Sequence, residues 1–443
     1  MGSGLLDRSI DRRRFLVGGA IGAGALALAA CGGAGSLESS DSVADPSKVS
    51  LALSSWYTTG SLKSFRGLAD RYHAAHPDVN VTVQVTPGTN FDEWFGIRLA
   101  GGQAPDIIRM QYQQAGRYIQ NGGLVNIASH LPPGFGDAYL PTFWDSVAHK
   151  GGIYGIPHHT DTFATYYRTD FLQQAGATAP DNLNNAWRWE DFLSIARKIK
   201  NATGKYAVSI GYAGANTAYR WLPLLYMHGG QLVASDGKTP AIESSQGVSA
   251  LTWTQNLYKE GLIPPSNTIK GSTANTARQY FTDGSVGLML NGDNQLTNLS
   301  TDMKDNQWGV TYMIRDSGRA SDLGGNILAV TRDCRSVKAA VDFLQFVCNQ
   351  DNTQTFVTDN NYIPTLKALS TKPLPYSYRP ELMQRFVEQA TTVPATMAKV
   401  ETASTFGDIN LMLADQLDLC FISQQSPAQT ASAIASALKK LLA

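Results

Sequence analysis

Residues 49–85 read VSLALSSWYTTGSLKSFRGLADRYHAAHPDVNVTVQV, and this stretch decides the fold. Its first part, residues 49–53, is a short apolar run that predicts a buried strand. Apolar residues between positions 62 and 72 then recur at helical spacing, and Pro77 ends the predicted helix. Across residues 79–85, valine alternates with polar residues, as in a β-strand with one buried face.

The same alternation of strand and helix continues downstream. Phe91–Ala100 predicts a second helix, which Gly101 and Gly102 end, and residues 105–108 (PDII) open another strand. Strands that alternate with helices predict an α/β fold with parallel strands covered on both faces. In such sheets, ligands bind at the carboxyl ends of the strands, near the point where the strand order reverses.

The rest of the chain is more helical. Residues 189–199 and 248–258 carry apolar residues at helical spacing, and a last helix is expected at about residues 427–442. Short strands are expected at residues 286–290 and 326–330. The second half therefore continues the α/β pattern with longer helical stretches.

The N-terminal segment has the layout of an export signal. Arg8 and residues 12–14 (RRR) precede an uncharged run at residues 17–30. That run is shorter than the roughly 20 apolar residues that a membrane-spanning helix needs. We expect residues 1–30 to be an export signal.

Two finer resemblances lie in this segment. Residues 11–16 (DRRRFL) resemble a twin-arginine signal, and residues 28–31 (LAAC) resemble a bacterial lipobox. In lipoproteins the cysteine, here Cys31, receives a lipid and anchors the chain to the membrane. The alternative is an ordinary signal peptide with an incidental cysteine. Residues 31–48 are rich in Gly, Ser, Ala and acidic residues, a composition typical of a flexible tether.

Composition excludes some classes of function. The chain has 443 residues, of which 43% are hydrophobic, enough for a core in more than one lobe. Its 36 basic and 36 acidic side chains balance, so no excess of positive charge indicates a nucleic-acid partner. Aromatic rings are frequent. They can fill a core or stack on the C–H face of a sugar, and composition does not separate the two uses.

The cysteines leave two interpretations open. If Cys31 carries a lipid, Cys334, Cys348 and Cys420 remain. One pair could form a disulfide outside the cell, or all three could be buried free thiols. Their wide spacing does not resemble a metal site, and we expect neither a metal nor another cofactor.

Five segments, in order along the chain, resemble conserved stretches of one family. They are residues 99–107 (LAGGQAPDI), 152–157 (GIYGIP) with 166–170 (YYRTD), 281–289 (FTDGSVGLM), 324–326 (GGN) with 337–344 (VKAAVDFL), and 362–364 (YIP). Together they resemble the extracellular solute-binding proteins of carbohydrate ABC importers, the maltose-binding-protein-like family.

The resemblance implies a two-lobed fold and a function without catalysis. It implies a first lobe at residues 49–157 and 287–326 and a second at residues 158–286 and 327–443, with the ligand in the cleft between them. It further implies a monomeric, lipid-anchored protein on the outer face of the cytoplasmic membrane. There it would bind a mono- or oligosaccharide and hand it to the membrane permease.

Two departures from the family pattern qualify the ligand. Arg168 stands where the family usually has Asn, and residues 291–293 (NGD) stand where maltose binders often have Gly-Pro-Trp. One expected stacking ring is therefore missing, so the resemblance does not extend to a malto-oligosaccharide ligand.

Candidate ligand-binding residues follow the strands or lie at the expected crossings between lobes. Ser55, Trp56 and Tyr57 follow the first strand, and Gln111 and Tyr112 follow the strand that begins near residue 105. Rings there could stack on a sugar, and the amide could bond its hydroxyls.

The other candidates lie near the expected crossings. They are His159, Asp161, Trp221, Asn291, Asp293, Gly325 and Asn326. A carboxylate can accept strong hydrogen bonds from adjacent sugar hydroxyls, and glycine lets backbone N–H groups approach a ligand. Core packing or a tight turn is the alternative for Trp221 and Gly325.

Two other functions remain to be weighed. A glycosidase needs two carboxylates flanking a bond, and neither Asp161 nor Asp293 sits in a glycosidase-like motif. A binder of a glycerophosphodiester should place arginine in the cleft, and Arg109, Arg168 and Arg220 keep this alternative open.

Overall fold

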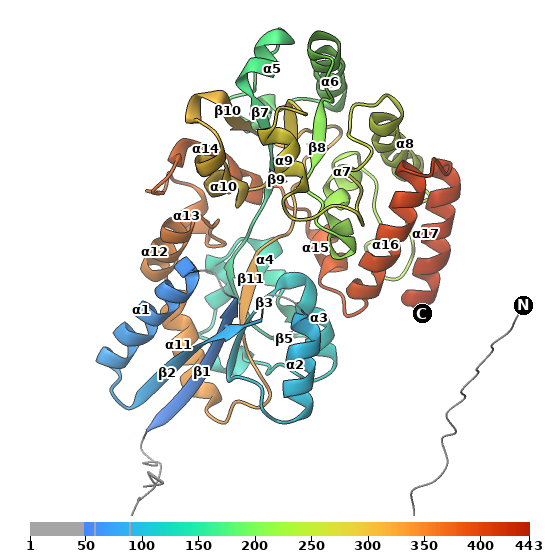
Figure 1. Cartoon of the computed structure of the whole chain (residues 1–443). Coiled ribbons are helices and arrows are strands. Elements are labelled where there is room, and N and C mark those ends of the chain that lie inside the picture. The colour runs from blue at the N-terminus through green and yellow to red at the C-terminus, as the bar shows by residue number, and fades with distance from the viewer. Residues whose placement is uncertain (1–47, 57–58, 88–89) are drawn as a thin grey trace, which may run out of the picture. The chain divides into compact units, whose positions relative to one another are not determined.

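Two β-sheets with helices on their faces organise the chain (Figure 1). The computed structural model describes residues 48–56, 59–87 and 90–443, without the side chains of Trp56 and Thr59. The strands are β1 (Val49–Trp56), β2 (Val79–Thr86), β3 (Ile107–Gln111), β4 (Ala148–His149), β5 (Gly152–Ile153), β6 (Ile156–His159), β7 (Phe163–Arg168), β8 (Val208–Ile210), β9 (Leu288–Gly292), β10 (Trp308–Thr311) and β11 (Asn326–Val330).

The helices connect and cover these strands. They are α1 (Thr59–Ala75), α2 (Phe91–Ala100), α3 (Tyr112–Gln120), α4 (Pro141–Asp145), α5 (Thr169–Gln174), α6 (Trp189–Thr203), α7 (Leu222–Met227), α8 (Ser245–Lys259), α9 (Thr276–Thr282), α10 (Gln295–Asp302), α11 (Val337–Val347), α12 (Gln350–Asn360), α13 (Lys367–Ser370), α14 (Pro380–Ala390), α15 (Ala395–Glu401), α16 (Phe406–Phe421) and α17 (Pro427–Leu441). The expected α/β fold is confirmed.

The first sheet forms as its sequence pattern predicts. Its strand order is β2-β1-β3-β11-β6, with β1 parallel to β2 and β3, and β11 antiparallel to β3 and β6. Val79 and Val81 turn inward from β2, while Leu51 and Leu53 of β1 are buried in the core. The period-two pattern thus gives one buried face to the first part of β2, an edge strand, whereas Val85 is 46% exposed and Thr86 is buried.

The second sheet has the order β10-β7-β9-β8. β7 lies between β10 and β9 and is antiparallel to both, whereas β8 runs parallel to β9. The side chains of β9 and β10 are all buried, as expected for strands that helices cover.

Strand pairing corrects the expected lobe limits. The sequence interpretation assigned residues 287–326 to the first lobe and residues 327–443 to the second. Instead, β9 and β10, within the first of these ranges, pair with β7 in the second sheet. β11 pairs with β3 and β6 in the first sheet. Their apolar sequences satisfy either sheet equally well, so local pattern did not specify the partner strand.

Two connections between the sheets touch at their backbones. One joins β6 to β7 through residues 160–162, and the other joins β10 to β11. At the contact, Gly324 N donates to Asp161 O at 3.1 Å. A Cβ atom at Gly325 would lie 2.4 Å from His159 O, and Gly325 has φ +86°, so glycine is required at this crossing.

The cysteines of the described part of the chain are free thiols. Cys334, Cys348 and Cys420 are all buried, which favours the free-thiol interpretation over a disulfide. Burial raises the pKa of Cys334 to about 12 and that of Cys420 to about 11, so both thiols are protonated at neutral pH. Cys31 lies outside the described residues.

Within that same part of the chain, no helix combines the length and the apolar character needed to cross a membrane.

Candidate functional site

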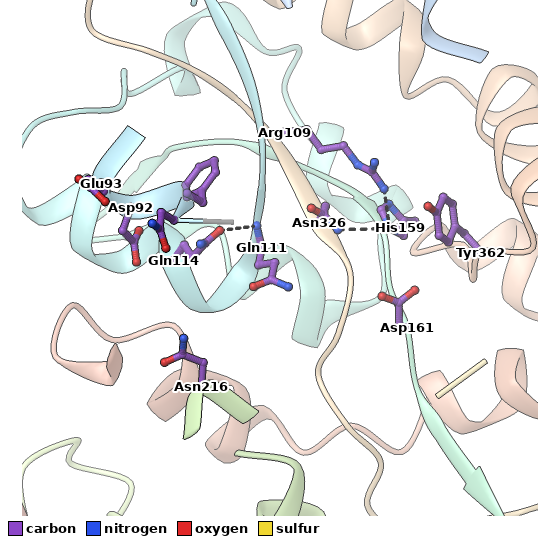
Figure 2. Close-up of a pocket in the computed structure, with 12 residues that line it drawn as sticks. Asp92, Glu93, Arg109, Gln111, Gln114, His159, Asp161, Asn216, Asn326 and Tyr362 are labelled. Carbon is purple, nitrogen blue, oxygen red and sulfur yellow. Dashed lines mark hydrogen bonds between the residues drawn. The ribbon is translucent and has the colours of Figure 1, made fainter. Parts of the chain in front are cut away.

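An open pocket lies at the carboxyl ends of β3 and β6 (Figure 2). Its volume is about 640 Å³, within the roughly 300–1,000 Å³ usual for small-molecule sites. The lining residues are Asn90, Phe91, Asp92, Glu93, Arg109, Gln111, Gln114, His159, Asp161, Asn216, Asn326 and Tyr362.

Sheet topology brings distant segments together here. Gln111 ends β3, His159 ends β6, and Asn326 begins β11, which lies between them. The register pairs Asn326 with both Gln111 and His159. Three polar residues thus occupy neighbouring strands at one edge of the sheet, where the strand order predicts a binding site.

The N-termini of α2 and α3 complete one side of the pocket, and α3 contributes Gln114. α2 begins beside Asn90, which has φ 57°, and presents Asp92 and Glu93 in its first turn. Asp92 Oδ1 accepts a 2.8 Å hydrogen bond from the Tyr118 hydroxyl. Acidic residues in a first turn stabilise a helix through its dipole, so Asp92 and Glu93 have a structural role whether or not they contact a ligand.

The buried guanidinium of Arg109 lines the pocket. Arg109 is 2% exposed, and its Nη2 lies 3.2 Å from His159 Nε2. Its Nη1 donates to Ser55 Oγ at 3.4 Å. Tyr362 stacks on His159 with ring centres 4.2 Å apart, and the Arg109 guanidinium carbon lies 5.4 Å from the Tyr362 ring centre.

The two adjacent histidines of β6 are held neutral. Burial lowers the pKa of His158 and of His159 well below the ordinary value, and the charge of Arg109 lowers both further. His158 packs between Phe65 and Phe356, with ring-centre distances of 5.3 and 4.3 Å. His158 is therefore a core residue, whereas His159 reaches the pocket.

Asp161 is the carboxylate that lies between the two sheets and lines the pocket. Burial raises its pKa, and the charges of Arg109 and Arg220 oppose that rise. Its Oδ1 is covered and has no hydrogen-bond partner among the described residues. A hydroxyl group of a ligand could donate the hydrogen bond that Oδ1 lacks.

Three further buried acids, Asp322, Asp293 and Glu401, form an electrostatically linked group with Asp161. Burial raises the pKa of Asp322 to about 7, with Arg220 opposing and Asp161 adding to the rise. Burial likewise raises the pKa of Asp293, with a further contribution from Asp161. Burial and the nearby Asp322 raise that of Glu401, which accepts a 2.9 Å hydrogen bond from Gln113. Asp322, Asp293 and Glu401 share a low-dielectric region, so their protonated forms are favoured. At Asp161 the charges of Arg109 and Arg220 favour the ionised form.

The chemistry of the lining suits a polar small molecule. Side-chain amides, three carboxylates and one phenol ring can form directional hydrogen bonds and a stacking contact. Within the described ranges, no group of three His, Cys, Asp or Glu side chains is arranged to hold a metal ion.

Comparison with known proteins identifies the family. Residues 67–383 match the family model for bacterial extracellular solute-binding proteins. The chain belongs to this family. The solute-binding protein is 24% identical to the lactose-binding protein of Rhizobium radiobacter over 360 residues, which cover 77% of this chain and 82% of that protein.

Two further similarities agree with this family. The protein is 23% identical to the maltodextrin-binding protein MdxE of Bacillus subtilis, covering 76% of this chain and 78% of that one. Its fold is similar to that of the GacH receptor of Streptomyces glaucescens, with a TM-score of 0.74, 21% identity, and coverage of 89% and 98% of the two chains. The resemblance stated from the sequence is confirmed for family and two-lobed fold.

The structure brings four of the predicted site residues of this solute-binding protein together. Gln111, His159, Asp161 and Asn326 all line the pocket. Ser55 lies behind it and contacts Arg109. The side chain of Trp56 and the whole of Tyr57 lie outside the described residues.

Three other predicted residues lie in the core instead. Trp221 is fully buried, and its Nε1 donates to Thr254 Oγ1 at 2.9 Å. Tyr112 is fully buried next to Phe143 at a ring-centre distance of 6.0 Å. Asp293 is also fully buried, and its Oδ1 accepts from the backbone N–H of Thr162. None of the three lines the pocket.

The remaining two predictions, Asn291 and Gly325, also lie outside the lining. Asn291 is 3% exposed at the end of β9, and its Oδ1 accepts from the Gly292 N–H at 2.9 Å. Gly325 serves the backbone crossing described above. Ligand contact by any of the candidates stays a prediction.

Sequence reasoning missed part of the lining. Asn90, Phe91, Asp92, Glu93, Gln114 and Asn216 were not predicted. The first four follow the carboxyl end of β2, the strand beside β1, so the strand-end rule applied to β1 and β3 would have found them at β2. Asn216 lies in the 3₁₀ helix η4 (Ala215–Trp221), and no local signal marks it.

Proposed function

We propose that this protein captures a mono- or oligosaccharide in the pocket and delivers it to the membrane permease of an ABC importer. The observation that carries the proposal is the pocket itself. It joins an acceptor, Asp161, with the amides of Gln111 and Asn326 and the ring of Tyr362. Relatives named for lactose and maltodextrin binding support a carbohydrate as the ligand.

Closure of the two lobes on the ligand is part of the proposal. With the corrected pairing, the first lobe carries β1, β2, β3, β6 and β11, and the second carries β7 to β10. The contact between Asp161 and Gly324 is the natural place for a hinge, because the chain passes from one sheet to the other there. Ligand binding would then favour the closed arrangement of the lobes.

A thermal-shift panel tests the carbohydrate ligand. Mature protein without the signal is heated with lactose, maltose, maltotriose, mannitol or glycerophosphodiesters, each at increasing concentration. We expect at least one sugar to raise the Tm in a saturable way, by mass action. A shift from a phosphodiester and none from any sugar would contradict the proposal.

The phosphodiester alternative has weaker structural support. Of the three arginines that kept it open, only Arg109 lines the pocket. Arg168 pairs with Asp170 at 2.9 Å, and Arg220 donates to the Gly211 carbonyl. Asp92, Glu93 and Asp161 meanwhile outnumber the one cation of the lining, which disfavours an anionic ligand.

We propose that the protein has no catalytic activity of its own. A glycosidase would need a pair of carboxylates that flank the scissile bond, and of the pair weighed from the sequence Asp161 lines the pocket while Asp293 is buried outside it. Release of free sugar from lactose or maltose by purified protein would contradict this.

The lipid anchor on Cys31 is a proposal from the sequence alone. We propose a monomer tethered to the outer face of the cytoplasmic membrane. Cys31→Ser should move the protein from the membrane fraction to the medium, with Cys334→Ser as the control. A Cys31→Ser variant that stays in the membrane fraction would contradict the anchor.

A further inference from the structure

Arg109 makes a contact that selects one tautomer of His159 in its observed ring orientation. A guanidinium carries hydrogen-bond donors and no acceptor. Its Nη2 lies 3.2 Å from His159 Nε2, and both side chains are buried. In this ring orientation Nε2 must therefore accept, which leaves the imidazole proton on Nδ1, an atom with no hydrogen-bond partner among the described residues.

We infer that Arg109 is a positioning residue of the pocket: it holds His159 as the neutral Nδ1–H tautomer and so keeps this end of the pocket a hydrogen-bond acceptor surface. What this tautomer means for the ligand depends on the proposed function. The state of His159 can be measured without any ligand.

Packing around His159 fixes its ring. Tyr362 stacks on it at 4.2 Å and 29°, and the Arg109 guanidinium lies over the same tyrosine. Phe356 of α12 lies 6.3 Å away. A ring held between these groups cannot turn to exchange Nδ1 and Nε2 without breaking the stack.

The positive charge of Arg109 favours the neutral form of His159, and its other titratable neighbours are His158, Tyr362 and Asp161. Arg109 faces it from β3, the neutral His158 precedes it, and Tyr362 follows α12. Asp161, two residues later, is the nearest acid on the same segment. Burial is the main cause that lowers the pKa of His159, and protonating it would also place a second buried cation beside the guanidinium of Arg109, 3.2 Å from Nη2.

The tautomer sets the orientation of Asn326. The Asn326 Nδ2 lies 3.4 Å from the same His159 Nε2, so an acceptor at Nε2 selects the amide orientation with the NH₂ group toward the imidazole. The Oδ1 of Asn326 then points away from His159, as drawn in Figure 2. Asp161 supplies carboxylate oxygens at the same end of the pocket.

This end of the pocket therefore presents hydrogen-bond acceptors, and a ligand that binds there needs hydrogen-bond donors. Neutral hydroxyl groups meet that requirement, whereas a carboxylate or phosphate would face Asp161 and the Asn326 oxygen. Arg109 directs Nη1 to Ser55 and Nη2 to His159, while its buried Nε has no hydrogen-bond partner among the described residues. The ligand class that fits is a neutral polyhydroxyl compound.

Nitrogen-15 NMR of histidine-labelled full-length mature protein tests the tautomer directly. The chain has 7 histidines, and His159→Gln assigns the relevant signal. We expect His159 to remain neutral with its proton on Nδ1 from pH 5 to pH 8 in wild-type protein. A wild-type His159 that carries its proton on Nε2, or that titrates near about pH 6.5, would overturn the inference.

A variant of Arg109 tests the cause. In Arg109→Met, His159 should titrate within that pH range, while the exposed control Arg197→Met should behave as wild type. If Arg109→Met does not fold, Arg109→Lys replaces it. Lysine also only donates, so His159 should keep the Nδ1–H tautomer there, and a proton on Nε2 would contradict the inference.

Sugar affinity supplies the functional readout. The probe is whichever of lactose, maltose and mannitol gives the largest thermal shift. Wild-type and Arg197→Met affinities should change less than about twofold between pH 7.5 and 5.5, whereas Arg109→Met should lose about tenfold at the lower pH. Equal pH profiles in wild type and Arg109→Met would contradict the positioning role. If none of the sugars binds, the proposed function fails, while the NMR result still decides the state of His159.

Discussion

Asp322, a buried residue that interacts electrostatically with Asp161 of the pocket, makes the stability of the protein depend on pH. The side chain is 3% exposed, and its Oδ1 has no hydrogen-bond partner in the described part of the chain. Burial raises its pKa to about 7, against the 3.8 of a free aspartate. The folded protein therefore holds a proton here that the unfolded chain releases above about pH 4.

The sign of the pH effect follows from this difference. Between about pH 4 and pH 7 the folded state binds more protons at Asp322, so stability falls as pH rises through that window. The loss amounts to at most about 4 kcal/mol for one group acting alone. Asp322→Asn keeps the neutral shape and should flatten the decline in the free energy of unfolding between pH 5 and pH 8.

Urea unfolding at several pH values measures this prediction. Asp359→Asn, an exposed substitution on α12, serves as the control and should reproduce the wild-type profile. Identical slopes for wild type and Asp322→Asn would show that other groups, such as Glu401 and Asp293, carry the pH dependence.

At the residue scale, the sequence predicted the chemical type of the pocket side chains better than it predicted which side chains would reach the pocket. Gln111 and Asn326 line the pocket because each stands at the same edge of the first sheet, which strand position predicts. Trp221 and Tyr112 have equally suitable chemistry, yet both lie in the core. Burial of an aromatic side chain depends on which helices pack against it, and no local pattern contains that information.

At the scale of elements, the crossing of the two connections constrains the structure most tightly. A Cβ atom at Gly325 would come within 2.4 Å of His159 O and of Thr160 Cα, both backbone atoms that cannot move away cheaply. The positive φ of 86° adds strain for any other residue. The crossing therefore depends on glycine for both space and conformation.

Gly325→Ala should destabilise the protein by roughly 2–4 kcal/mol and weaken sugar binding, because the pocket residues His159 and Asn326 flank the crossing. Gly96, inside α2, has open space where its Cβ would lie. Gly96→Ala should therefore be neutral or stabilising by up to about 1 kcal/mol. Chemical denaturation of both variants measures the contrast, and similar values of ΔΔG would mean that the crossing is more plastic than its geometry indicates.

Sequence patterns predicted elements more reliably than their partners. The strands and helices of residues 49–110 follow directly from the period of their apolar residues. The pairing of β9 and β10 with β7 was missed, because buried strands carry continuous apolar runs that fit either sheet. Long-range pairing is a property of the assembled fold and is not encoded in a window of five residues.

At the scale of the whole molecule, the pocket sits where a change in lobe arrangement would reshape it. Asp161 belongs to the segment that joins the sheets, Gln111 and Asn326 belong to the first sheet, and Asn216 comes from η4. A ligand that bonds groups on both sides would therefore link binding to closure. This arrangement agrees with a protein that captures and releases its solute.

Calorimetric titration of the best sugar from the panel into wild-type protein and Asp161→Asn tests the central claim most directly. The amide keeps the size of the side chain and removes the charge, which weakens its bonds to hydroxyl groups. We predict binding of one neutral sugar per chain, with an affinity at least about tenfold weaker in Asp161→Asn, equal to a loss of roughly 1.4 kcal/mol. Saturable binding of a phosphodiester in place of any sugar, or equal sugar affinity in both proteins, would contradict the claim.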